Sequence, residues 1–400
     1  MPKKTVEDIE VKGKKVLLRV DFNVPLDINT GDISDDSRIQ SSLPTIKYLV
    51  NHKSKVILCS HLGRPGGKVV ENLRMAPIVH RLSQLTGLPV STASDCIGQE
   101  VENKVETLKE GDILVLENLR FHPEEEANDA GFARKLARLA DIYVNDAFGS
   151  AHRTHASTVG VAKYLPAVAG FLMKRELEVM GKLLHNPERP SACLIGGAKV
   201  SDKIELLQNM LRKVDKLMVG GGMAATFLKT QGYEIGRSLI ENDKLGLARK
   251  LLQEAQEWKV PFLLPIDLIV AEEIKAGALT RIVPTTNIPS GSHIVDIGPQ
   301  SIELFYNELK KCRTIIWNGP MGIYEIPQFA QGTRSIASFL ATLNATTIIG
   351  GGSSAEIVQE MGLTDKMTHV STGGGASLRF LEGVTLPGVK VLLDKNERRL

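Results

Sequence analysis

The first half of the chain carries basic, amide and acidic side chains directly after short apolar runs. The candidates for binding an anionic substrate are Asp21, Asn23, Arg38, His61, Arg64, Arg120 and Arg153. A guanidinium binds phosphate or carboxylate through two parallel hydrogen bonds, so several together can hold a doubly anionic molecule in one orientation. Asp21 and Asn23 suit a hydroxyl group. This half therefore predicts a pocket for a small phosphorylated acid, although any one arginine alone would more often be a surface ion-pair partner.

Arg38 is a separate signal because it stands near the start of a predicted helix. Asp36 and Ser37 are expected to cap that helix. A cation at this end opposes the helix dipole, which costs a few tenths of a kcal/mol, about 0.3 or more. A role in stabilising a transferring phosphoryl group would explain the arginine, and so would simple exposure to solvent. Both interpretations stay open from the residues alone.

The second half carries lysines and glycine triplets instead. Lys199 and Lys203 follow Gly196-Gly197 and are four residues apart, so they are expected to share one face at the start of a helix. Positive charge is unfavourable there unless a polyanion docks between the lysines, or unless Asp202 and Glu205 neutralise them. Glycine triplets at 220–222, 350–352 and 373–375 allow a backbone to approach phosphate closely. This half predicts a nucleotide site.

A dehydrogenase is the competing enzyme class. Gly220-x-Gly222-x-x-Ala225 and Gly350-x-Gly352-x-x-Ala355 both fit the dinucleotide fingerprint. That fingerprint also needs an acid at the end of the next strand, about 20 residues on. Glu241 and Asp243 follow a polar stretch with no strand before them, which disfavours this class. The chain also lacks the Gly-x-x-x-x-Gly-Lys-Ser/Thr pattern of P-loop enzymes.

Composition narrows the remaining classes. The net charge of +3 is too small and dispersed to indicate a nucleic-acid partner. The four cysteines form no Cys-x-x-Cys pair, so neither a disulfide framework nor a zinc site is expected. His152 and His155 are expected to shape a loop rather than bind zinc. No apolar run approaches a membrane span, and we expect a cytoplasmic protein with no membrane partner.

The periodicity predicts an α/β fold with two domains. Short apolar runs predict buried parallel strands at 16–20, 56–60, 113–117, 142–145, 192–195, 216–220, 262–265, 314–317, 347–350 and 368–371. Helices are expected at 38–52, 132–140, 204–214 and 245–258, and a hinge helix at 169–184. The predicted domains are residues 1–170 with the tail 389–400, and residues 171–388. Ligands of such sheets bind beyond the carboxyl ends of the strands, where the unusual residues lie.

Nine segments together resemble the phosphoglycerate kinase family, in order and over nearly the whole chain. They read RVDFNVP, SHLGRP, ENLRF, NDAFGSAHRTHAS, GGAKVSDK, GGGMAATFL, WNGPMG, STGGGAS and LPGV. The resemblance implies two Rossmann-like domains with parallel sheets, joined by a hinge helix. It also implies a cytoplasmic, Mg²⁺-dependent monomer of glycolysis and gluconeogenesis. Such an enzyme transfers a phosphoryl group reversibly from 1,3-bisphosphoglycerate to ADP, giving 3-phosphoglycerate and ATP.

The resemblance assigns roles to the candidate residues. The arginine-rich set, with Asp21, Asn23 and His61, would bind 3-phosphoglycerate in the first domain. Arg38, Lys199 and Gly373, Gly374 and Gly375 would act on the transferring phosphoryl group. The nucleotide in the second domain would be bound by Lys203, Gly220, Gly221, Asn318, Glu325, Gly351, Gly352, Ser353 and Ser354.

One departure from the family pattern bears on function. Ser353 stands where the family usually has an aspartate associated with Mg²⁺, and a hydroxyl is a weaker ligand for that ion than a carboxylate. The residues that hold the metal are therefore unknown from the sequence. Ile294 and Arg379 also replace a common glycine and a common acid, so their contacts are not transferred. A protein that binds nucleotide but turns over poorly is the non-catalytic alternative.

Overall fold

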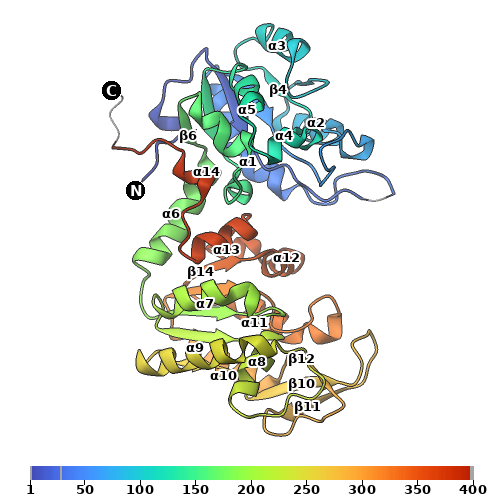
Figure 1. The fold of residues 1–400 in the computed structure, drawn as a ribbon, viewed down its shortest axis with the longest axis vertical. Coiled ribbons are helices and arrows are strands. Elements are labelled where there is room, and N and C mark those ends of the chain that lie inside the picture. The colour runs from blue at the N-terminus through green and yellow to red at the C-terminus, as the bar shows by residue number, and fades with distance from the viewer. Residues whose placement is uncertain (1, 28, 397–400) are drawn as a thin grey trace. The chain divides into compact units, whose positions relative to one another are not determined.

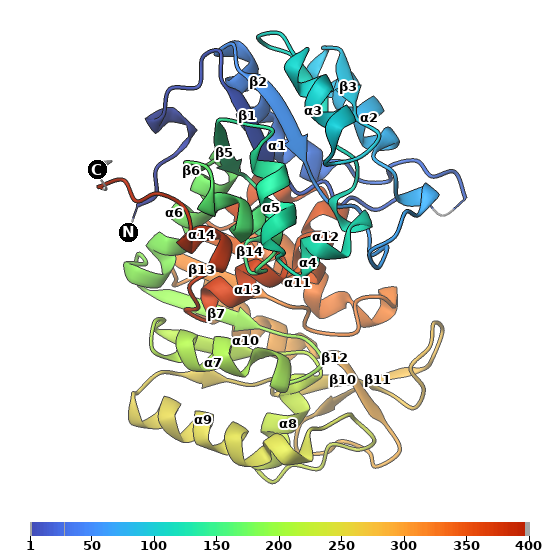
Figure 2. The same cartoon turned by 45° about the horizontal axis from the view of Figure 1, so that its top comes forward.

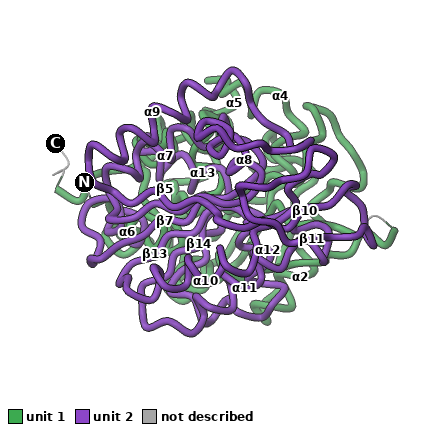
Figure 3. The backbone as a smooth tube through the Cα atoms, turned by 90° about the horizontal axis from the view of Figure 1, so that it is seen from below, with its two compact units in different colours: residues 1–178, 385–400 green, residues 179–384 purple. Residues whose placement is uncertain are grey.

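The computed structural model describes residues 2–27 and 29–396. Contacts divide the chain into two compact units (Figures 1 and 3). Unit 1 runs to Glu178 and takes in the segment from Thr385 onward, and unit 2 runs from Val179 to Val384. The division falls inside helix α6 (Phe171–His185), which carries the chain from one unit to the other.

Unit 1 is built on one parallel sheet of six strands. In spatial order they are β3 (Val90–Thr92), β4 (Ile113–Val115), β2 (Lys55–Cys59), β1 (Lys15–Arg19), β5 (Ile142–Asn145) and β6 (Ala167–Ala169). The central strands are buried because their apolar, β-branched residues lie between two layers. The periodicity did not predict β3 and β6, since each has three residues and β3 is largely exposed.

The helices of unit 1 are α1 (Ser37–Asn51), α2 (Ala76–Thr86), α3 (Gln99–Glu106), α4 (Pro123–Glu126), α5 (Ala130–Ala137) and α14 (Pro387–Lys390). The C-terminal segment returns to this sheet. Asn145 Nδ2 donates to the Gly388 carbonyl at 3.2 Å, and Lys3 forms an ion pair with Asp394 at 2.9 Å. A side chain at Gly388 would press on the Ala151 backbone at 3.0 Å, so glycine permits this close contact.

Unit 2 contains a second six-stranded parallel sheet. Its order is β15 (His369–Val370), β14 (Thr346–Gly350), β13 (Thr314–Asn318), β7 (Ser191–Ile195), β8 (Lys216–Val219) and β9 (Phe262–Leu263). The helices are α7 (Ile204–Leu211), α8 (Met223–Thr230), α9 (Leu245–Glu257), α10 (Pro299–Leu309), α11 (Gln331–Leu340), α12 (Gly352–Glu360) and α13 (Gly375–Leu381). Figure 3 shows α7 and α9 on one side of the strands and α10 and α11 on the other. These two parallel α/β sheets confirm the predicted fold class.

A three-stranded antiparallel sheet in unit 2 was not predicted. It consists of β11 (Thr280–Pro284), β10 (Asp267–Ala271) and β12 (His293–Ile297). Leu268 and Val270 of β10 pack with Ala225 and Leu228 of α8, beside which the small sheet lies (Figure 2). Strand β11 is an exposed edge with no alternation between buried and exposed residues, so it carries little of the usual strand signal.

Each parallel sheet has one point where the chain reverses its direction across the strands. In unit 1 the chain leaves β1 toward β2 but leaves β5 toward β6, on the opposite side. In unit 2 it leaves β7 toward β8 and β13 toward β14. Loops that follow such neighbouring strands diverge and open a crevice at the carboxyl ends. The fold therefore places one ligand crevice in each unit.

Candidate functional site

Asp21 and Arg38 form an ion pair at the crevice of unit 1. Arg38 Nη1 lies 2.8 Å from Asp21 Oδ2, and the arginine side chain is 33% exposed. Burial alone would raise the pKa of Asp21, but His61, Arg38 and Arg19 together lower it below its ordinary value. The carboxylate thus stays ionised and offsets the unfavourable position of a cation at the start of α1.

The predicted cap of α1 is corrected by the structure. Asp36 is the N-cap residue, but its side chain makes no capping hydrogen bond. Its carboxylate instead accepts from Gln40 Nε2 at 2.6 Å and forms an ion pair with Arg81 at 2.7 Å. Ser37 is the first helical residue rather than a cap.

His61 is a buried, neutral imidazole at the same edge. Burial depresses its pKa well below the ordinary value, and Arg19, Arg120 and Arg153 depress it further, against the effect of Asp21. Arg19 Nη2 lies 3.1 Å from His61 Nδ1. Because a guanidinium only donates, Nδ1 accepts and Nε2 carries the proton. The Nε2–H group is thereby available as a hydrogen-bond donor to an anion.

Arg120 and Arg153 add positive charge next to His61. Arg120 is buried, donates to the Gly63 carbonyl at 2.8 Å and has Nε 3.1 Å from Glu126. Burial lowers the pKa of this guanidinium, and the neighbouring Arg153 lowers it further. A buried cation that is destabilised by other cations is stabilised when an anion binds.

Arg19 and Glu125 are functional candidates that the sequence reasoning did not single out. Arg19 ends strand β1, is 1% exposed, and donates through Nε to Ser157 Oγ at 2.9 Å. Glu125 accepts from the Ser157 backbone N–H and hydroxyl, at 2.9 and 2.5 Å. Burial raises the pKa of Glu125 and lowers the pKa of His155 to about 4. A charged residue as the last member of an apolar strand was the available signal for Arg19.

The structure thus brings most of the predicted acid-binding set to one edge of unit 1. Asp21, Arg38, His61, Arg120 and Arg153 interact directly or electrostatically. Asn23 belongs to the same loops, because its Oδ1 accepts from the Gly63 backbone N–H at 2.8 Å. Arg64 follows Gly63 and is exposed to solvent, so its side chain is placed near this edge but is not held by it.

The crevice of unit 2 is a cavity of about 450 Å³. Its walls come from the loops after β7, β8 and β13 and from strand β12, and they are mostly apolar or glycine. The lining includes Gly197, Gly221, Ile294, Pro320, Tyr324, Glu325 and Ser353. Its dimensions and apolar walls suit a flat heterocycle with a few polar groups at one end.

The two lysines do not share a helix face, and that prediction was wrong. Helix α7 begins at Ile204, with a single 3-10 turn at Ser201–Lys203 before it, and Lys199 lies in the preceding loop. Lys199 is exposed, whereas Lys203 is half-buried and donates from Nζ to the Asn318 carbonyl at 3.0 Å and to its side-chain oxygen. Glu205 forms an ion pair with Arg379 at 3.0 Å, so the prediction that Glu205 neutralises the lysines was wrong.

The glycines divide into two groups by what surrounds them. A Cβ at Gly221, where φ is +69°, would meet the Gly197 backbone N at 2.7 Å and the Pro320 carbonyl at 2.8 Å. This glycine therefore lets the loops after β7, β8 and β13 pack together, rather than serving only a ligand. By contrast, a Cβ at Gly352 or Gly374 would meet nothing within 4 Å. Those two positions present open backbone to a ligand.

Ser353 and Ser354, in the first turn of α12, have different surroundings. Ser354 is buried, and its Oγ accepts from the Gly319 backbone N–H at 2.6 Å. Ser353 interacts with the Tyr324 hydroxyl and lowers its pKa, but burial and Glu356, which accepts from that hydroxyl at 3.2 Å, raise the pKa above its ordinary value. Nearby, the Asn318 Nδ2 is buried without a hydrogen-bond partner among the described residues. An unsatisfied buried donor next to open backbone indicates the place of an absent acceptor group.

We expect Gly196→Ala to destabilise unit 2 strongly. The added Cβ would lie 2.0 Å from the Pro320 carbonyl oxygen, so the backbone must shift, at a cost of about 3 kcal/mol. Urea unfolding followed by the fluorescence of Trp258 and Trp317, both in unit 2, measures this loss. The matched control is Gly246→Ala in α9, where a Cβ meets nothing within 4 Å and should stabilise by up to about 1 kcal/mol. Equal midpoints for the two variants would contradict this packing argument.

Comparison with known proteins decides the family. A family model described as phosphoglycerate kinase matches residues 6–384. The chain belongs to the phosphoglycerate kinase family. Phosphoglycerate kinases of Pelotomaculum thermopropionicum and Dictyoglomus turgidum are 56% and 58% identical to it over 395 and 399 residues, covering 99% of this chain and 100% of each relative. The solved phosphoglycerate kinase of Coxiella burnetii superposes with a TM-score of 0.87 at 40% identity, over 98% of both chains. The solved phosphoglycerate kinase of Pyrococcus horikoshii superposes with a TM-score of 0.83 at 33% identity, covering 97% of this chain and 98% of the other.

Family membership settles the enzyme class. The activity is that of a phosphoglycerate kinase, a phosphotransferase with a carboxyl group as acceptor that works with ATP and ADP in glycolysis. The resemblance read from the nine segments is confirmed, and the dehydrogenase alternative is wrong. Among the described helices, none combines the length and apolar character that a membrane span requires.

Proposed function

We propose that the arginine-rich edge of unit 1 binds 3-phosphoglycerate or 1,3-bisphosphoglycerate. The observation that carries the proposal is the surplus of guanidinium groups around a neutral, buried His61. Arg120 and Arg153 supply charge for the phosphate. The Asp21 carboxylate accepts from the hydroxyl group, and Asn23 donates to it through Nδ2. Arg64 and Arg38 complete the set from the exposed side. Arg19 holds the His61 ring rather than the substrate.

ATP or ADP then occupies the cavity of unit 2. The apolar wall receives the base, and Glu325 at the exposed rim suits the ribose hydroxyls. Lys203 with Asn318 lies along the phosphates, together with the open backbone at Gly352 and the backbone of Gly351, which packs against the Asn318 side chain. The hydroxyls of Ser353 and Ser354 lie along the same phosphates. Gly220 and Gly221 contribute indirectly by allowing the three loops to meet.

Phosphoryl transfer between these ligands needs no general base. In one direction a β-phosphate oxygen of ADP attacks the acyl phosphate, and in the other the carboxylate of 3-phosphoglycerate attacks the γ-phosphate. Neither nucleophile carries a proton that must be removed. Catalysis therefore consists of in-line positioning and charge stabilisation. Arg38, Lys199 and the backbone N–H groups of Gly374 and Gly375 stabilise the oxygens of the phosphoryl group in flight. The Gly373 N–H donates to Ser371 Oγ at 3.1 Å, so this glycine acts by shaping the loop.

Because the acid and the nucleotide bind to different units, α6 acts as the hinge that lets both ligands meet. Small-angle X-ray scattering of the full chain tests this arrangement with each ligand alone and with both. The radius of gyration should fall only when 3-phosphoglycerate and the nucleotide are both saturating. An unchanged radius with both ligands bound would refute the two-unit assignment.

Mg²⁺ is the family's expected cofactor, but the donor set in the cavity fits it poorly. The lining carboxylates are Asp296 and Glu325. Asp296 is buried and accepts from the backbone N–H groups of Gly332 and Ile297, at 2.7 and 2.8 Å, and burial raises its pKa to about 7. Ser353 and Ser354 offer hydroxyls that already have partners. Among the described residues that line the cavity, the other carboxylate is Glu325, which lies at the exposed rim and is placed on the ribose. We therefore assign Mg²⁺ to the nucleotide phosphates, with no catalytic step through the protein's own ligands.

Ser353→Asp should therefore reduce the Mg²⁺ requirement. A carboxylate at this position adds a hard oxygen ligand, so half-maximal activity is expected at a Mg²⁺ concentration several-fold lower, on the order of tenfold at most. Steady-state rates across a Mg²⁺ titration at fixed ATP measure the shift. Ser338→Asp, at an exposed position of α11, is the control for added charge and should leave the titration unchanged. An identical midpoint in Ser353→Asp would remove Ser353 from the metal's surroundings.

Nucleotide affinity should fall as pH rises above about 8. Burial, the largest effect, lowers the pKa of Lys203 to about 8. The charged form, present below that pH, attracts the phosphates, so the dissociation constant is flat below pH 8 and rises up to about tenfold per pH unit above it. Calorimetry of ADP binding from pH 7 to 10 measures this profile. Lys203→Met should bind weakly at every pH with a flat profile, and a retained rise in that variant would assign the titration to another group.

The remaining expectations concern the state of the enzyme in the cell. The family resemblance supports a monomer in the cytoplasm, with no nucleic-acid or membrane partner. The net charge of +3 is consistent with small-molecule substrates as the only ligands. Sedimentation velocity checks the monomer, which a concentration-dependent shift to twice the mass would contradict.

A further inference from the structure

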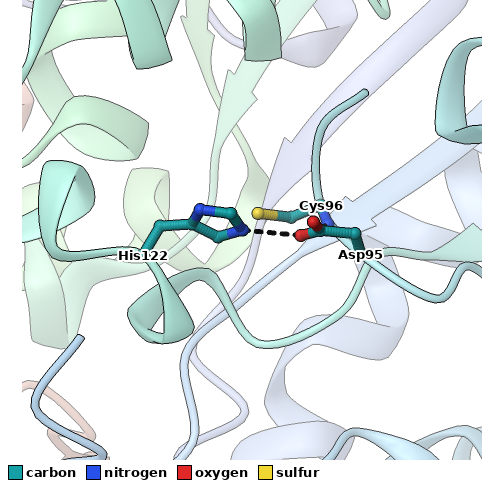
Figure 4. Close-up of side chains that lie close together, drawn as sticks. All are labelled: Asp95, Cys96 and His122. Atoms are coloured by element: carbon teal, nitrogen blue, oxygen red, sulfur yellow. Dashed lines mark hydrogen bonds and ion pairs between the residues drawn. The ribbon is translucent and has the colours of Figure 1, made fainter. Parts of the chain in front are cut away.

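A cluster of three potential metal ligands lies in unit 1, apart from the acid-binding residues. Asp95 and Cys96 belong to the segment between β3 and α3, and His122 lies immediately before α4. The carboxylate oxygen, the sulfur and the imidazole nitrogen all lie within 4.8 Å of one another, and His122 Nε2 is 2.6 Å from Asp95 Oδ1. Figure 4 shows the sulfur and the carboxylate facing the Nε2 side of the ring. Within residues 2–27 and 29–396 this is the one such group.

We propose that Asp95, Cys96 and His122 bind a zinc ion through one carboxylate oxygen, the thiolate sulfur and Nε2, with water as the fourth ligand. Zinc accepts this combination of sulfur, nitrogen and oxygen ligands in a tetrahedral arrangement. With bonds of about 2.0–2.3 Å, neighbouring ligand atoms of such a site are about 3.3–3.6 Å apart. The separation of Nε2 and the carboxylate oxygen is shorter than this, at 2.6 Å, and all three ligand atoms lie within 4.8 Å, so side-chain rotations would admit the ion.

The surroundings hold both segments in place for binding. The His122 ring packs against Phe132 with centroids 5.3 Å apart, and its backbone N–H donates to the Leu119 carbonyl at 3.2 Å. On the other side the Asp95 carbonyl accepts from the Glu117 backbone N–H at 3.3 Å. The ligands are thus presented by backbone that is already fixed, which reduces the entropy lost when the ion binds.

Burial and charge also suit a zinc site with one open position. Cys96 is fully buried, whereas the Asp95 and His122 side chains are 46% and 25% exposed, which gives the ion and a water molecule access from solvent. The thiolate and the carboxylate together carry two negative charges, which the divalent ion neutralises. Binding displaces the proton of the thiol and the proton shared between His122 and Asp95. A buried thiol alone would not indicate a site, but the carboxylate of the adjacent Asp95 and the imidazole of His122, from a separate segment, both converge on it.

This inference concerns a property beyond the kinase reaction, and the sequence spacing did not indicate it. The ligands on the two segments are 27 residues apart and form none of the usual cysteine patterns. His122 follows Arg120 by two residues, so a bound ion would also fix the turn that carries this arginine. We assign the ion a structural role in that turn and no part in phosphoryl transfer.

Cobalt(II) is the probe for the test, because it replaces zinc and is coloured. The full chain, free of nucleotide and Mg²⁺, is titrated with CoCl₂. The expected result is one equivalent bound, with tetrahedral visible bands and a thiolate-to-cobalt charge-transfer band in the near ultraviolet. Adding ZnCl₂ should bleach all of these bands by displacement. Kinase turnover is assayed separately, so failure of the metal site and failure of the kinase assignment are distinguishable.

Two ligand variants and one control complete the experiment. Cys96→Ser should lose the charge-transfer band, and His122→Gln should weaken cobalt binding by at least about tenfold. Cys312→Ser, in unit 2, removes a thiol outside the cluster and should change nothing. Circular dichroism establishes whether each variant is folded. If Cys96→Ser does not fold, the test rests on His122→Gln, because His122 is partly exposed. No charge-transfer band in the natural chain, or unchanged affinity in His122→Gln, would overturn the proposal.

Discussion

Replacing Arg38 by alanine is expected to lower kcat by about 10²–10³-fold, with a smaller effect on KM for 3-phosphoglycerate. Such a loss corresponds to about 2.7–4 kcal/mol of transition-state stabilisation. The structure supports this expectation because Arg38 is the second residue of α1 on the crevice edge, is 33% exposed, and is held by Asp21 at 2.8 Å. A partly exposed guanidinium that keeps its orientation is free to contact a phosphoryl group that arrives from the nucleotide.

Steady-state kinetics with both substrates varied separates kcat from KM for this variant. Arg81→Ala is the matched control, since it removes a 40% exposed arginine that pairs with Asp36 at the same end of α1. It should lose a few tenths of a kcal/mol of stability, about 0.5, and leave kcat unchanged. Arg38→Lys keeps the charge but not the planar fork and should recover only part of the rate. If kcat of Arg38→Ala matched that of the control, Arg38 would lie outside the chemistry.

Lys199→Ala should also reduce kcat by about 10²-fold or more while leaving the protein's stability unchanged. Lys199 is exposed in the loop after β7, at the mouth of the unit 2 crevice, and its neighbour Ala198 lines the cavity. Because this ammonium has no buried role, its loss tests function without disturbing the fold. In contrast, Lys203 is anchored to Asn318, and in the proposed site it would contact the nucleotide in the ground state. Replacing Lys203 should mainly raise the KM for the nucleotide.

Kinetics and thermal unfolding of Lys199→Ala are compared with those of Lys250→Ala. Lys250 is a 65% exposed residue of α9 in the same unit. Both variants should unfold at the natural chain's temperature, and only Lys199→Ala should turn over slowly. A raised KM for ATP with an unchanged kcat would move Lys199 from the transferring group to the binding of the nucleotide.

Sequence reasoning was most successful where one physical rule determines position. Short apolar runs predicted the buried strands, and parallel strands bring their carboxyl ends to one edge. That rule alone places Asp21, His61, Arg120 and Arg153 together, although they come from four separate strands. The same rule brings the loops at Gly197, Gly221 and Pro320 to one cavity.

The sequence failed where tertiary packing decides. Spacing by four residues suggested one helix face for Lys199 and Lys203, but the turn at Ser201–Lys203 intervenes before α7 begins. Glycine triplets suggested phosphate contacts, yet Gly221 serves loop packing, and only its neighbours in space reveal this. Arg19 appeared as an ordinary strand residue because its partners, His61 and Ser157, are remote in sequence. Exposed edge strands such as β11 carry too weak a pattern to be detected.

The most direct test of the whole account is the 3-phosphoglycerate-dependent consumption of ATP by the purified chain in the presence of Mg²⁺. We predict sustained turnover that requires both 3-phosphoglycerate and ATP and that falls by at least about 10²-fold in Arg38→Ala. Nucleotide binding without turnover at any Mg²⁺ concentration would contradict the account. It would favour a protein that binds nucleotide without catalysis, with Ser353 as the first residue to replace.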